Sequence, residues 1–137
     1  MSTRAWVAIV VLAHLIVTLF HGHAHTSLIV GLSNWQNIYV ITIILLAPLF
    51  ALALSFTRYA RPALWLLLLS MLGALIFGVC YHYVIISPDH VAHLPPGDAR
   101  GAFRLTALLL VVTEALGVVV AAVALQRTAN YKKAQEA

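Results

Sequence analysis

Hydrophobic residues occur along this chain in four long, continuous runs, which cover residues 5–30, 35–56, 62–86 and 102–126. Each run is long enough to cross a bilayer, which takes about 20 residues at a rise of about 1.5 Å each. Because backbone groups in hydrocarbon must pair within their own segment, continuous apolar runs predict helices rather than the alternating strands of a barrel. We therefore expect an all-α integral membrane protein, with four transmembrane helices in a single domain (residues 1–137).

The first run has a second interpretation, as a signal peptide. Arg4 would be its basic start, and Gly22-His23-Ala24 would be its small-x-small cleavage site. The apolar stretch continues beyond that site to Val30, however. This continuation favours a helix that is retained.

The overall composition agrees with a membrane protein. Only 9% of the residues are charged and 63% are hydrophobic, whereas a soluble domain carries about 25% charged residues. The net charge of +4 comes mainly from basic residues that flank the apolar runs, so we expect contact with the lipid bilayer and no nucleic-acid partner. The sequence contains no phosphate loop, no Gly-rich dinucleotide motif, no Cys-x-x-Cys and no His-Glu-x-x-His. The sequence therefore contains none of these motifs on which an assignment to a soluble enzyme class would rest.

Basic residues also predict the orientation of the four spans. Two of them, Arg100 and Arg104, fall on one side of the membrane. Six fall on the other side: Arg4, Arg58, Arg61, Arg127, Lys132 and Lys133. The excess of Lys and Arg on cytoplasmic loops places both termini in the cytoplasm and the long loop 87–101 outside. We expect the plasma (inner) membrane to be the location.

Small residues spaced four apart indicate which helix faces pack together, because they let two backbones approach closely in lipid. Three of the runs contain such rows: Ala47, Ala51 and Ser55; Ser70, Ala74 and Gly78; Thr113, Gly117 and Ala121. These rows predict a compact, antiparallel up-down bundle.

Histidines in the first run form a polar stripe. At about 100° per residue, His21 and His25 each fall within about 20° of His14 on the helix surface, one on either side of it. His23 points to nearly the opposite side, and we interpret it as an interfacial bystander. Titratable residues inside a membrane helix are costly and are usually functional, so the stripe predicts a buried site.

Other polar residues can join this stripe. His82 continues the row of small residues in the third run, and Glu114 is the only acidic residue within any run. Depth along the helices places His25 level with His82, His21 about one and a half turns deeper, and Glu114 near the midplane, where we expect it to have a histidine partner. In the outer loop, His90 and His93 can fold over the mouth of the bundle and supply ligands or a lid.

Imidazole is a frequent ligand of copper, iron and zinc, and helical bundles build metal sites from inward-facing side chains. We therefore hypothesise a metalloprotein, with redox activity as one option and with the histidine cluster on the non-cytoplasmic side. Its principal ligands are His21, His25 and His82. Glu114 is a ligand or a base, and the further candidates are His14, His90 and His93.

Three alternatives to a metal ion remain open at this point. The first is a single b-type haem held by two histidines on different helices. The second is a proton or ion pathway along the polar column. The third is an accessory subunit without a cofactor that docks onto another membrane or extracytoplasmic protein. The sequence decides neither whether a reaction is catalysed nor the oligomeric state.

Overall fold

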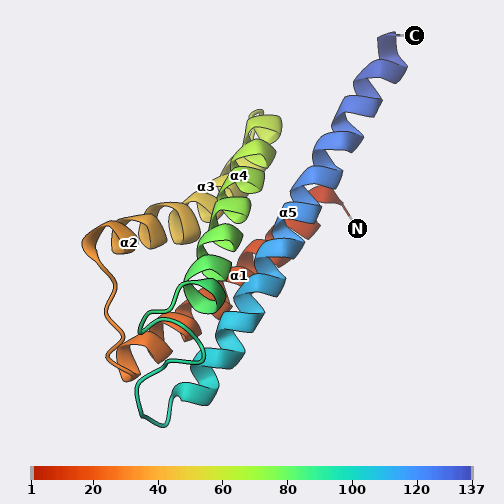
Figure 1. Cartoon of the computed structure of the whole chain (residues 1–137). Helices are drawn as coiled ribbons and strands as arrows, with labels where there is room; N and C mark the ends of the chain where they lie inside the picture. Colours follow the sequence, from red (N-terminus) through yellow and green to blue (C-terminus); the bar gives the residue numbers. More distant parts are fainter. Residues whose placement is uncertain (1, 137) are drawn as a thin grey trace.

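The computed structural model describes residues 2–136, with the side chains of residues 131–133, 135 and 136 left aside. Lys132 and Lys133, which count toward the predicted orientation, thus lie outside the described side chains. The chain forms four helical spans that pack as a bundle (Figure 1). Each span is apolar and long enough to cross a membrane, with a mean hydropathy between 2.1 and 2.6. The predicted all-α, four-helix membrane bundle is confirmed.

The first span is α1 (Thr3–Ser27), and the fourth is α5 (Arg100–Glu136). The second span consists of α2 (Asn34–Tyr39), the π-helical segment η1 (Val40–Leu46) and α3 (Ala47–Ser55). The third consists of α4 (Ala60–Val79) and the π-helical segment η2 (Cys80–Val84). The π-helical segments were not predicted from the sequence. Such wide turns often occur at functional sites, and η2 carries the buried His82.

The π-helical segment η1 lies directly before Pro48, and the two features explain the position of His14. Proline has no N–H, so Pro48 cannot donate to the carbonyl of Ile44 four residues earlier. Instead, Nε2 of His14 lies 3.1 Å from that carbonyl oxygen. Because a carbonyl only accepts, this nitrogen donates the hydrogen bond. His14 therefore links α1 to the second span.

The half of the bundle that contains the N-terminus holds most of the apolar core, in which α5 packs against both α1 and α4. Small residues permit the close approach of α4 and α5. Ser70, Ala74 and Gly78 of the predicted row are all buried. A Cβ atom added to Gly117 would lie only 2.7 Å from Cγ of Met71, which is fully buried. The two backbones are thus as close as these side chains allow.

The opposite half is built differently, because α1 and α2 diverge there and a linker joins them (Figure 1). The first helix ends at Ser27 rather than continuing to Val30, and Ile29 in the linker has a positive φ of 56°. The loop before α5 covers this end of the bundle. The N–H of Val91 donates to the carbonyl of His82 at 3.0 Å, and Nε of Arg104 donates to the carbonyl of Val91 at 2.9 Å. These bonds hold the loop over the end of α4 and η2.

Candidate metal site

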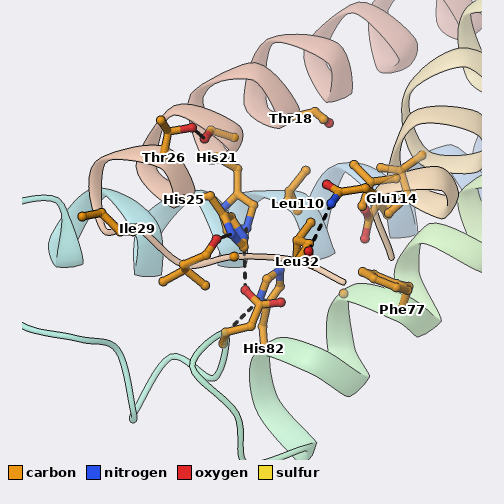
Figure 2. Close-up of a pocket in the computed structure, with 18 residues that line it drawn as sticks. Thr18, His21, His25, Thr26, Ile29, Leu32, Phe77, His82, Leu110 and Glu114 are labelled. Atoms are coloured by element: carbon orange, nitrogen blue, oxygen red, sulfur yellow. Dashed lines mark hydrogen bonds and ion pairs between the residues drawn. The ribbon is translucent and has the colours of Figure 1, made fainter. Parts of the chain in front are cut away.

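Three histidines from two spans meet beneath the outer loop. His21 and His25 lie one turn apart on α1, and His82 reaches them from η2 (Figure 2). The ring centroids are 4.7 Å apart for His21 and His25, and also for His21 and His82. One ring nitrogen from each residue lies within 4.8 Å of the others, so the three could hold a metal ion. We call these residues the histidine triad.

Hydrogen bonds at Nδ1 determine which nitrogens of the triad are free. Nδ1 of His25 lies 3.2 Å from the carbonyl of Val30, and Nδ1 of His82 lies 3.1 Å from the carbonyl of Asp89. A carbonyl oxygen only accepts, so both Nδ1 atoms carry the proton. In a neutral imidazole the other nitrogen, Nε2, then has an unprotonated lone pair.

His21 reaches the same state through a side chain on α5. Its Nδ1 lies 2.9 Å from Oγ1 of Thr106. The hydroxyl proton of Thr106 is directed to the carbonyl of Ala102 at 2.7 Å, so Oγ1 accepts from His21. In their neutral form, all three histidines therefore carry the proton at Nδ1 and leave Nε2 free. This arrangement is typical of histidines that ligate a metal, whose second N–H is bound by an oxygen acceptor.

Asp89 in the outer loop brings a carboxylate to the triad. Its Oδ1 lies 3.1 Å from Nε2 of His25 and 3.4 Å from Nδ1 of His82. The residue is only 4% exposed, and among the described residues neither carboxylate oxygen has an aligned hydrogen-bond donor. A buried carboxylate without aligned donors requires a compensating positive charge.

The ionisation of Asp89 reflects two opposing effects. Burial by itself would raise the pKa of Asp89, but hydrogen bonds and charge interactions with the imidazoles of His25 and His82, when these rings are protonated, hold that pKa below its ordinary value. Asp89 is therefore the anionic member of the cluster. It can neutralise one positive charge placed among the histidines.

A cavity of about 560 Å³ lies beside the triad, and Glu114 lines it. Glu114 is only 1% exposed, and its Oε2 has no hydrogen-bond partner among the described residues. In Figure 2 it lies beside Phe77, away from His21 and His25. The histidine partner expected for Glu114 is therefore not found. The acid that contacts histidines is Asp89.

The remaining predicted site residues lie outside the triad. His14 is bound to the carbonyl of Ile44, and His23 is exposed, as the stripe predicted. His90 and His93 lie against each other, with ring centroids 5.0 Å apart, and Nδ1 of His90 accepts from the N–H of Ala92. The outer loop thus does fold over the mouth of the bundle, but it does so with Asp89 instead of a histidine.

Different depths along the helix do not keep the rings of His21 and His25 apart. His21 was expected about one and a half turns below His25, yet the two Nε2 atoms are 3.2 Å apart. Side chains on a helix lean toward its N-terminus, so the ring of His25 lies over the turn that carries His21. Backbone depth alone therefore overestimated their separation.

Sequence reasoning missed Asp89 and Thr106. The available signal for Asp89 was its position three residues after the third apolar run, in a loop stiffened by Pro88. Thr106 is two turns before Glu114 on the same helix face, at a period of eight residues. Neither signal identifies the histidine that the residue contacts.

No protein-family model, curated protein or solved structure matches this chain.

Proposed function

We propose that this protein is an integral membrane metalloprotein that binds one transition-metal ion through Nε2 of His21, His25 and His82. Asp89 supplies the fourth ligand. One observation carries the proposal. The Nε2 atoms of His21 and His25 are 3.2 Å apart, although the proton of each neutral ring is already held at Nδ1. Two lone pairs at this distance repel each other, and a cation that binds both removes the repulsion.

The distances fit a tetrahedral ion. Two nitrogen ligands at about 2.0–2.1 Å from zinc, separated by the tetrahedral angle, lie about 3.3–3.4 Å apart. The Nε2 atoms of His21 and His25 are 3.2 Å apart, and Oδ1 of Asp89 is 3.1 Å from Nε2 of His25. Both values are close to an edge of such a tetrahedron. The nitrogens of the whole triad are within 4.8 Å of one another, so side-chain movement has to shorten the longer distances before all three bind one ion.

A set of three imidazoles and one carboxylate narrows the class of ion. These ligands suit zinc, copper and iron, whereas calcium and magnesium prefer sites made of oxygen alone. Zinc would make the site structural or hydrolytic, and copper or iron would make it redox-active. Haem fits less well, because a macrocycle must pass between its two axial histidines. Here the ring centroids of the triad lie only 4.7 to 6.2 Å apart, which leaves no space for a macrocycle between any two of them.

We also propose that the triad faces the non-cytoplasmic side of the plasma membrane. Nε of Arg4 donates to the carbonyl of Ser55 at 3.1 Å, and Arg127 lines a cavity together with Thr3. These basic residues gather at the end of the bundle opposite the triad. The excess of basic residues at that end supports a cytoplasmic location for both termini.

Metal analysis of the purified protein tests the function. The chain, extracted in mild detergent and loaded separately with Zn²⁺, Cu²⁺ or Fe²⁺, should bind close to one equivalent of at least one of these ions. The His82→Ala variant should lose the ion, because it removes one ligand and leaves the rest of the bundle intact. The matched control is His23→Ala, which alters an exposed histidine of the same helix as His21 and His25.

Two results would contradict the proposal. The first is a wild-type protein that binds none of the three ions above the level of the His82→Ala variant. The second is a Soret band in the absorption spectrum of the wild type, which would favour haem. A proton shared between His21 and His25 could also relieve the repulsion of their lone pairs, and the absence of bound metal would support that explanation.

A further inference from the structure

The cavity beside the triad has a polar end and apolar walls. Its polar end is formed by Glu114, whose Oε2 is buried without a hydrogen-bond partner among the described residues. The triad and Asp89 line another part of the cavity, and apolar side chains from three spans contribute to the rest: Val40, Ile44, Phe77 and Leu110. Its volume of about 560 Å³ falls within the range of about 300–1,000 Å³ that is usual for small-molecule sites.

Most of the exposed residues that line the cavity belong to α1 and to the linker that precedes α2, so the opening of the cavity lies between these two segments. Gly22 and Gly31 line it, and a Cβ atom added to either glycine would meet nothing within 4 Å. The helices beside this opening carry apolar side chains that are largely exposed, Phe20 at 65% and Ile38 at 63%. Exposed apolar surface of this kind on a membrane span faces the acyl chains of the bilayer. A molecule dissolved in lipid can therefore reach the cavity without passing through water.

Ile29 lies in the linker at the same opening, lines the cavity and is 92% exposed. Its φ of 56° is unusual for a β-branched residue. Backbone strain of this type persists where the surrounding structure imposes it, and it concentrates at ligand-binding and switching segments. The strained linker thus marks the mouth of the cavity.

The chemistry of Glu114 selects the type of ligand. Moving a charged molecule from water into the hydrocarbon of the bilayer costs much free energy, so a ligand that enters from lipid is neutral. A carboxylic acid both donates and accepts a hydrogen bond, and an alcohol or phenol hydroxyl does the same. A hydroxyl can therefore pair with Glu114 in either protonation state, which a ketone or an ether cannot do.

We propose that this cavity binds a neutral, lipid-soluble molecule with a hydroxyl head group, of the alkylphenol or long-chain alcohol class. The hydroxyl bonds to Glu114, and the apolar tail leaves between α1 and the linker. A Cβ atom added to Gly78 would lie 3.5 Å from Oε2 of Glu114 and 3.9 Å from Cδ2 of His82. The bound head group is thus next to the triad. The site does not require a metal, so this inference and the proposed metal site can fail independently.

A series of three ligands tests this inference on the unmodified protein in lipid nanodiscs. A photoreactive alkylphenol with a diazirine in its tail is cross-linked, and the labelled peptides are mapped by mass spectrometry. We expect labelling in the segment from Gly22 to Leu32. Unlabelled 4-octylphenol should compete at least about tenfold better than octylbenzene, because it alone satisfies the buried carboxyl group. The methyl ether 4-octylanisole, which cannot donate, should fall between the two.

The Glu114→Leu variant provides the second measurement. It should abolish the preference for 4-octylphenol over octylbenzene, whereas Leu116→Ala should preserve it, because Leu116 is 52% exposed on the same helix. Circular dichroism verifies that both variants retain their helices. Equal competition by phenol and octylbenzene in the wild type would overturn the inference. So would labelling spread evenly over the lipid-facing helices, or a folded Glu114→Leu variant that keeps the preference.

Discussion

Oδ1 of Asp89 lies 3.1 Å from Nε2 of His25, so a loop residue and the last turn of the first helix share one buried site. The contact depends on the loop following η2, in which the carbonyl of Asp89 also accepts from Nδ1 of His82 at 3.1 Å. Asp89 therefore fixes the tautomer of one histidine with its backbone and approaches another with its side chain. This double role makes the loop part of the proposed metal site.

Replacing Asp89 tests whether its carboxylate is a ligand. Asp89→Asn keeps the backbone carbonyl that orients His82 but removes the negative charge. We expect metal affinity to fall by at least about 10–100-fold, the range seen when a supporting group around a metal is lost. Competition with a chromophoric chelator measures the change. The matched control is Asp98→Asn, which alters an exposed acid of the same loop and should leave affinity unchanged. Equal affinity of Asp89→Asn and wild type would remove Asp89 from the site.

Thr106 is predicted to act through His21. Thr106→Val removes the oxygen that accepts from Nδ1 of His21 at 2.9 Å while nearly preserving side-chain volume. Because the histidine is then free to change tautomer and orientation, metal affinity should fall by about 10–100-fold. The same chelator competition measures it.

Thr113→Val is the control for that substitution. Thr113 lies on the same helix, and its hydroxyl bonds only to the carbonyls of Leu109 and Leu110 among the described residues. Its replacement should leave metal affinity within about twofold of the wild type, because a residue bonded only within its own helix does not orient a ligand. Similar losses of metal affinity in Thr106→Val and Thr113→Val would show that Thr106 supports the stability of the fold in general and does not orient His21.

His14 is predicted to be structural. His14→Leu should leave the carbonyl of Ile44 without its donor at 3.1 Å, and it should lower the free energy of unfolding by about 1–3 kcal/mol. Metal stoichiometry should not change. Thermal unfolding in detergent micelles, followed by circular dichroism, measures the loss.

A double-mutant cycle with Pro48 tests the reason for that loss. Pro48→Ala restores an N–H that can donate to Ile44, so the cost of His14→Leu should be smaller in the Pro48→Ala background. Equal costs in the two backgrounds would mean that His14 does not compensate for the proline.

Gly117 tests how closely α4 and α5 are packed. In Gly117→Ala the new Cβ would lie 2.7 Å from Cγ of the fully buried Met71, so we expect a loss of about 1–3 kcal/mol from overpacking. Gly101→Ala on the same helix meets nothing within 4 Å and should be neutral, or stabilising by up to about 1 kcal/mol, because alanine favours helix. The unfolding midpoint should therefore fall in Gly117→Ala and stay the same or rise in Gly101→Ala. A similar fall of the midpoint in both variants would contradict this interpretation.

Much of the architecture followed from local patterns. The four apolar runs predicted four membrane helices because the bilayer requires long segments that satisfy their own hydrogen bonds. Helical periodicity alone grouped His21 with His25 and set His23 apart. The row from Ser70 to Gly78 likewise placed His82 on a buried face. These predictions depend only on spacing along one helix, which is fixed by the geometry of the backbone.

What only the tertiary structure decided is how residues on different segments meet. The sequence favoured Glu114 as the acidic partner because it lies within a span, yet the loop brings Asp89 to the histidines and leaves Glu114 at a separate end of the cavity. The sequence pattern also grouped His14 with the site. In the structure, His14 binds instead to the carbonyl of Ile44, to which Pro48 cannot donate. Contacts between distant segments depend on how each loop closes and on which backbone groups lack partners, and no periodicity along a single helix contains that information.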